Sequence, residues 1–135
     1  MIRNDYIMQM IQQIGALVAR IMNRELTQDA MRSELDALTS QWIGLPIEVL
    51  LSLPEDYVFS LFEDSDRMVI EKSYLMGEVL RAQGVVAESD EARAEFFAKA
   101  RFFFEKCSGL VDDPLQQAID DRLGELKETQ EGELD

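Results

Sequence analysis

Histidine is missing from this chain, and cysteine, proline and glycine are few. The 135 residues contain no histidine, one cysteine, three prolines and seven glycines. Without histidine there is no Ser–His or Cys–His pair, and the most frequent general base and metal ligand of proteins is absent. The single Cys107 cannot form an internal disulfide, which fits a reducing cytoplasm. These absences make most nucleophilic and metal-dependent enzymes poor candidates.

Long apolar runs and positive charge are also scarce. No apolar segment approaches the roughly 20 residues that span a membrane, and the opening residues do not have the pattern of a secretion signal. Lys and Arg number 13 against 27 Asp and Glu, so the formal net charge is −14. Residues 112–135 alone carry nine acidic and two basic side chains. We therefore expect a cytoplasmic protein that binds no membrane and no nucleic acid, and that favours a basic protein partner.

The length and the apolar content of the chain suit one compact domain. Compact domains cluster near roughly 100–150 residues, and 47% of these residues are apolar. The last residues, Glu-Thr-Gln-Glu-Gly-Glu-Leu-Asp, are polar and mostly acidic. We expect a single helical domain over residues 1–128 and a disordered acidic tail over residues 129–135.

Apolar residues recur at helical spacing through the chain, and no alternating strand pattern competes with them. Thr27, Ser89 and the pair Asp113-Pro114 are helix-start signals, and Gly44 and Gly84 are helix-stop signals. The pattern predicts an all-α protein whose helices begin near residues 4, 27, 46, 53, 65, 89 and 113.

The first predicted helix carries a broad apolar arc. The arc covers about half of the helix circumference, more than the roughly 100° that a surface helix usually buries. Such a helix must be covered from two directions, so it lies either at the centre of a monomer or in the seam of a homodimer. We favour a homodimer, and the candidate interface residues are Ile7, Met10, Ile14, Leu17 and Ile21.

Residues 74–107 resemble one helical hairpin of the tetratricopeptide type. The small and aromatic residues that match this repeat are Gly77, Gly84, Ala92, Phe96 and Ala100. The resemblance implies two closely packed antiparallel helices, because Gly77 and Ala92 admit a close approach and Phe96 fills the cleft between them. A single repeat cannot bury its own apolar face, so the flanking helices must cover it. The expected fold is an all-α, tetratricopeptide-like array of about seven antiparallel helices.

A short signature near the start of the chain carries a second resemblance. Asp5, Tyr6, Met8 and Ile11 form the pattern Asp-Tyr-x-Met-x-x-Ile. With the Leu-rich middle and the Ala- and Phe-rich hairpin, the chain resembles a family of small uncharacterised bacterial proteins that begin with this signature. The resemblance implies a tetratricopeptide-like helical array and brings no activity, substrate or cofactor.

Carboxylates remain as candidates for chemistry. The densest groups are Glu63-Asp64 with Asp66, Asp112-Asp113 and Asp120-Asp121. The first two groups stand where a helix N-terminus favours negative charge, and adjacent helical residues such as Asp120 and Asp121 point about 100° apart. We interpret these groups as helix caps and solvated surface residues and not as metal ligands, so we expect no catalytic residue, metal or cofactor.

The sequence favours a non-enzymatic protein–protein interaction module over two alternatives. The first alternative is an enzyme that uses carboxylates with a divalent metal ion. The second is an acidic mimic of nucleic acid, which requires an ordered face of carboxylates. Half of the net charge lies in the final helix and tail, so the mimic ranks below the enzyme.

Overall fold

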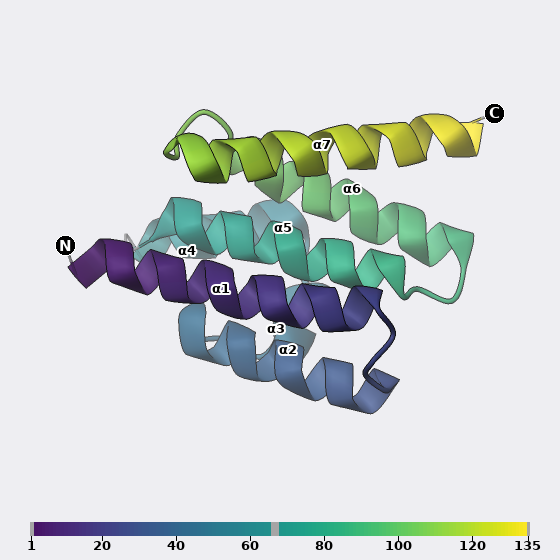
Figure 1. Ribbon diagram of the computed structural model, residues 1–135, viewed down its shortest axis with the longest axis horizontal. Helices are drawn as coiled ribbons and strands as arrows, with labels where there is room; N and C mark the ends of the chain where they lie inside the picture. The colour runs from purple at the N-terminus through teal and green to yellow at the C-terminus, as the bar shows by residue number, and fades with distance from the viewer. Residues whose placement is uncertain (1, 66–67, 135) are drawn as a thin grey trace.

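The computed structural model describes residues 2–65 and 68–134, and the side chains of residues 8–65, 68–112 and 114–127. The described residues form seven helices and no strand (Figure 1), which confirms the predicted all-α class. The helices are α1 (Ile2–Met22), α2 (Gln28–Trp42), α3 (Ile47–Ser52), α4 (Glu55–Ser65), α5 (Val69–Val85), α6 (Asp90–Cys107) and α7 (Asp113–Leu134).

Several helix boundaries follow from local side chains. The Thr27 hydroxyl accepts a hydrogen bond from the Ala30 amide, and the Ser89 hydroxyl accepts one from the Ala92 amide, so both predicted starts are capped. The fifth helix begins at Val69 instead of near residue 65. Met68 has the left-handed φ of 52° just before it, and this conformation cannot continue a helix.

The last helix is longer than the pattern suggested. It continues to Leu134, whereas a disordered tail was predicted for residues 129–135. Gln130, Glu131, Glu133 and Leu134 in this segment are good helix formers even where no apolar stripe marks a helix. Asp135 lies outside the described residues.

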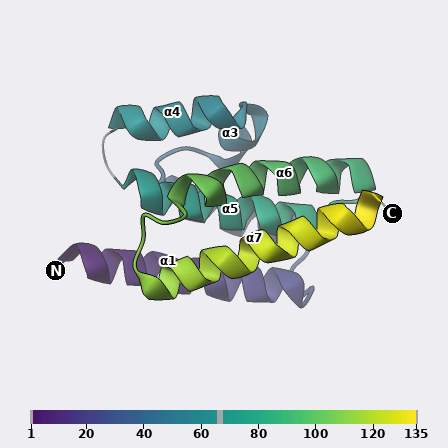
Figure 2. The ribbon, with the colours of Figure 1, turned by 90° about the horizontal axis from the view of Figure 1, so that it is seen from above.

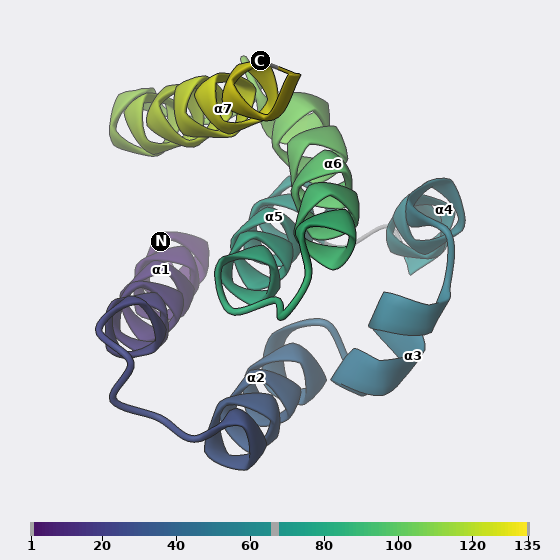
Figure 3. The same cartoon turned by 90° about the vertical axis from the view of Figure 1, so that its right-hand side faces the viewer.

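The centre of the fold is α5. All its side chains from Ser73 to Gln83 are buried, together with Gly84. α6, α1 and α4 pack around it (Figure 3). A helix surrounded on all sides is apolar around most of its circumference, as Tyr74 to Leu80 are with the exception of Glu78.

The pairing of α5 with α6 depends on two glycines. A Cβ at Gly77 would lie 2.7 Å from the Phe104 ring, and a Cβ at Gly84 would lie 2.5 Å from the Phe97 ring. The close approach expected at Gly77 is present, but the aromatic residue that fills it is Phe104 and not Phe96, which is only partly buried. The tetratricopeptide-like stacking of the whole array stays a prediction.

Two helices lie on the same side of this central hairpin. Figures 2 and 3 show α1 and α7 on the side of α5 that faces away from α3 and α4. α1 packs on α5 and α2, where Trp42 Nε1 donates a hydrogen bond to Gln13 Oε1 at 2.8 Å. α7 packs mainly on α6. This arrangement positions the groove described below.

Candidate functional site

Four of the five predicted interface residues are buried inside one chain. Met10 and Ile14 are fully buried, and Leu17 and Ile21 nearly so. The side chain of Ile7 lies outside the described residues. These four side chains belong to the core that α1 forms with its neighbours α5 and α2. No second copy is needed to cover them, and the homodimer stays a prediction.

A different stripe of α1 remains exposed. Met8 is 54% exposed, and Met22, Gly15 and Ala19 are also exposed, while Ile11 is partly buried. The five positions are three or four residues apart, so they share one face of the helix. A Cβ at Gly15 would meet nothing within 4 Å, so the space beside it is open. Contiguous exposed apolar surface of this kind marks sites of interaction.

The first part of this stripe is one wall of an apolar groove. α5 provides the floor, and the segment after α6 with the first turns of α7 provides the opposite wall. Figure 3 shows how α1, α5 and α7 are arranged. The volume of the groove is about 630 Å³, which lies within the roughly 300–1,000 Å³ of ligand-binding sites. The lining residues are Met8, Ile11, Ile70, Glu71, Tyr74, Leu110, Val111, Asp112, Pro114, Leu115 and Ala118.

The turn between α6 and α7 places two apolar side chains at the groove. Gly109 takes the positive φ of 81° that the turn requires, and its amide donates to Gln116 Oε1 at 2.5 Å. The amide nitrogen of the same Gln116 side chain donates to the Ser108 hydroxyl at 3.1 Å. These bonds hold the turn against α7. Leu110 belongs to this hydrogen-bonded turn, and its side chain is 65% exposed.

Tyr74 forms the buried floor of the groove. Its ring packs edge-on against Phe104 with the centroids 6.0 Å apart. Burial raises the pKa of the Tyr74 hydroxyl above its ordinary value, and the negative charge of Glu78 raises it further. Tyr74 therefore stays neutral at physiological pH and presents mainly an apolar ring to the groove.

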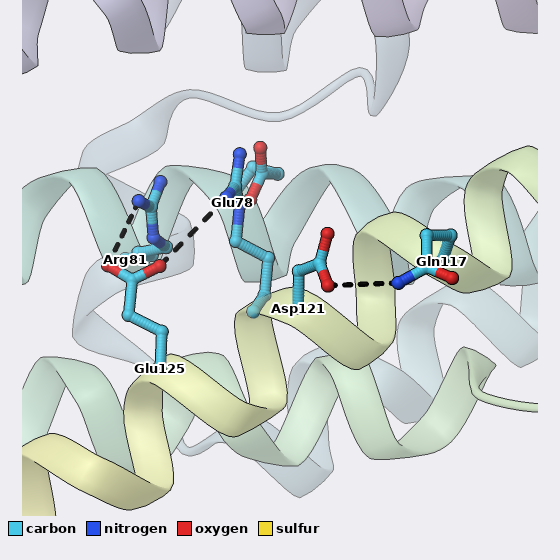
Figure 4. A network of polar contacts seen from close by, with 6 residues as sticks. Glu78, Arg81, Gln117, Asp121 and Glu125 are labelled. Atoms are coloured by element: carbon cyan, nitrogen blue, oxygen red, sulfur yellow. Dashed lines mark hydrogen bonds and ion pairs between the residues drawn. The ribbon is translucent and has the colours of Figure 1, made fainter.

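Ion pairs connect the floor to the α7 wall (Figure 4). Arg122 Nε lies 3.0 Å from Glu78 Oε1, and Arg81 Nη2 lies 3.1 Å from Glu125 Oε1. Glu78 and Arg81, which belong to α5, are buried. Burial alone would lower the pKa of Arg122, but the charge and hydrogen bond of Glu78, together with electrostatic interactions with Tyr74 and Glu125, outweigh that effect and raise it. The position of α7 beside the groove is thus held by paired charges as well as by its apolar contacts with α6.

The carboxylate groups considered for metal binding are dispersed in the structure. Asp120 accepts a hydrogen bond from Gln116, and Asp121 accepts one from Gln117 (Figure 4). Glu63 and Asp64 are exposed, while Asp66 and the side chain of Asp113 lie outside the described residues. In the part of the chain that the structure describes, no group of three or more His, Cys, Asp or Glu residues is placed to hold a metal ion.

Cys107 is fully buried within the core. Burial raises the pKa of its thiol to about 12, against a smaller opposite effect of a backbone hydrogen bond. Its sulfur lies 3.4 Å from the Phe103 and Phe104 carbonyl oxygens. The thiol therefore stays protonated at neutral pH and packs as a small apolar residue.

Local sequence patterns did not predict the groove residues of α5 and of the turn. Ile70 and Tyr74 belong to α5, whose central position arises from its contacts with α6, α1 and α4 and not from its own residue spacing. Leu110-Val111 could have been noticed, because an apolar pair directly before the helix-start signal Asp112-Asp113-Pro114 commonly packs against the first turns of the helix. In the sequence, Met8 and Ile11 belong to the signature and to the broad apolar arc of the first helix.

Comparisons with known proteins give no further assignment. No family model, no curated protein and no solved structure matches the chain. Among the described helices, none combines the length and apolar character that crossing a membrane requires.

Proposed function

We propose that this chain is a non-enzymatic protein–protein interaction module that docks another protein in the groove between α1, α5 and α7. The observation that carries the proposal is that two large exposed apolar side chains, Met8 and Leu110, line one groove of about 630 Å³. Large exposed apolar side chains cost solubility, so their concentration at one hollow favours a binding role.

Two features of the surroundings support this proposal. The floor is built on the buried helix α5, and the far wall is anchored to it by the Glu78–Arg122 and Arg81–Glu125 pairs. A groove on such rigid elements is largely formed before a partner arrives, which lowers the entropic cost of docking. A cytoplasmic location is part of the proposal and is supported by the lone, buried Cys107 thiol.

The homodimer is a separate prediction. Because Met10, Ile14, Leu17 and Ile21 are buried within one chain, a second copy would have to use the outer stripe with Met8 and Met22. Light scattering at micromolar concentration decides between a monomer and a dimer.

Site-specific photocrosslinking tests the proposed function. A photoreactive phenylalanine analogue replaces Leu110 in the groove, or Tyr57 as the control, in the full chain produced in its own cells. Tyr57 is 54% exposed and lies on α4, on the opposite side of α5. We expect discrete crosslinked proteins from position 110 and none of the same proteins from position 57. Equal crosslinking at both positions, or none at 110, contradicts the proposal.

A further inference from the structure

We infer that the occupant of the groove is the apolar face of a basic amphipathic helix from another protein. This inference rests on the proposed function and specifies the chemistry of the partner. It follows from the shape of the groove, from the charges that line it and from the net charge of the chain.

The apolar residues of the groove follow helical periodicity on each of its helices. Met8 and Ile11 on α1, Ile70 and Tyr74 on α5, and Leu115 and Ala118 on α7 are three or four residues apart. Each helix thus offers a pair of apolar side chains separated by one helical turn. An inserted helix that presents side chains at i, i+3 or i+4, and i+7 matches this spacing.

The outer stripe of α1 extends the docking face beyond the groove. Ala19 and Met22 are exposed, and the space beside Gly15 is open. A residue without a side chain allows another backbone to come close. A docked helix can therefore continue along α1 past the end of the enclosed hollow.

The described charged side chains at the groove are negative. Among the described residues that line it, the only charged side chains are Glu71, which is largely buried, and Asp112, which is exposed at the rim. Asp120 and Asp121 follow as exposed residues on α7, and residues 112–135 carry nine acidic and two basic side chains. A helix with Lys or Arg flanking its apolar face is attracted to this rim, whereas an acidic one is repelled.

The same charges disfavour a second copy of the chain as the occupant. Each copy has a formal net charge of −14, so two copies repel one another at long range. The most apolar face of α1, with Met10 and Ile14, is already buried in its own chain and is not available for insertion into another groove. A partner of opposite charge is favoured on both grounds.

Designed peptides of 18 residues test this inference with the full chain. One peptide is a leucine–lysine amphipathic helix, the second replaces each lysine with glutamate, and the third scrambles the leucine–lysine sequence to remove its apolar face. Calorimetric titration is carried out at low and at high salt. We expect the amphipathic basic peptide to bind, at least about tenfold more tightly than either control peptide, and less tightly as salt screens the charges.

Matched variants locate the binding. Met8→Ser with Leu110→Ser removes two exposed apolar contacts of the groove, and Tyr57→Ser with Val49→Ser removes two exposed apolar side chains that do not line it. We expect the first variant to bind the basic peptide about tenfold more weakly, and the second to bind it like the unmodified chain. Asp112→Lys should weaken binding of the basic peptide and improve binding of the acidic one.

Each contrary outcome overturns the inference. If Met8→Ser with Leu110→Ser leaves binding of the basic peptide unchanged, the peptide is attracted by net charge alone and does not dock in the groove. Failure of the basic peptide to bind, or dimerisation through the groove in light scattering, also removes the inferred occupant. If the acidic peptide binds more tightly than the basic one, and Met8→Ser with Leu110→Ser removes that binding, the inferred basic partner is wrong while the proposed interaction module stands. The photocrosslinking result reports on the module separately.

Discussion

At the closest approach of α5 and α6, Gly77 has no room for a side chain. A Cβ there would lie 2.7–2.8 Å from three carbon atoms of the fully buried Phe104 ring. We predict that Gly77→Ala destabilises the chain by about 1–3 kcal/mol, because the ring must move within a packed core. Urea unfolding measures the change.

Gly124 provides the matched control for this substitution. It also lies within a helix, but a Cβ there would meet nothing within 4 Å. Gly124→Ala should stabilise the chain by up to about 1 kcal/mol through helix propensity. Equal effects of alanine at the two glycines would contradict the close packing of α5 on α6.

Because the Cys107 thiol is buried, we expect the folded chain to lose stability at alkaline pH. Its pKa is raised to about 12 in the folded chain, whereas an unfolded thiol ionises near its ordinary value of 9.0. Proton uptake by the folded form thus stabilises it below pH 9, and this contribution is lost as the pH rises from 9 toward 12. We predict that the free energy of unfolding falls over this range, and less steeply in Cys107→Ala. Identical pH dependence in both proteins would contradict the burial of the thiol.

At the level of helices, the sequence predicted most elements but not their centre. Helix-start residues such as Thr27 and Ser89, and regular apolar spacing, are local signals that survive in the fold. The central position of α5 requires Glu78 and Arg81 to be buried. Their burial is possible because they pair with Arg122 and Glu125 of α7, a helix that is distant in the sequence. Long-range pairing of this kind leaves no local pattern, so the residue spacing within α5 does not reveal its central position.

The two apolar stripes of α1 should respond differently to a charge. Ile14 is fully buried, and Met8 is exposed at the groove. We predict that Ile14→Asp costs at least about 3 kcal/mol, since it buries a charge without a partner. Met8→Asp should change stability by less than about 0.5 kcal/mol.

Circular dichroism and the fluorescence of Trp42, the single tryptophan, follow both variants. Trp42 is a sensitive reporter because it is buried and bonded to Gln13 of α1. A folded, monomeric Ile14→Asp protein would show that this stripe is a seam between copies and would contradict the single-chain core.

For the whole molecule, composition bears on the charge of a partner but not on the place where the partner docks, and the basic partner stays a prediction. The excess of 27 acidic over 13 basic residues favours a basic partner whatever the fold. The groove itself combines α1, α5, the turn at Leu110 and α7, which are distant in sequence. No spacing within any one segment specifies such a combination, so the sequence pointed instead to Met10, Ile14, Leu17 and Ile21, which are core residues.

Hydrogen–deuterium exchange of the full chain, with and without the leucine–lysine peptide, tests the central claim most directly. The measurement reports which backbone amides the bound peptide protects. The account predicts protection confined to α1 residues 8–22, which carry one groove wall and the outer stripe, and to the other segments that line the groove, residues 69–75 and 108–119. Protection centred on α3 and α4, or none at saturating peptide, would contradict it.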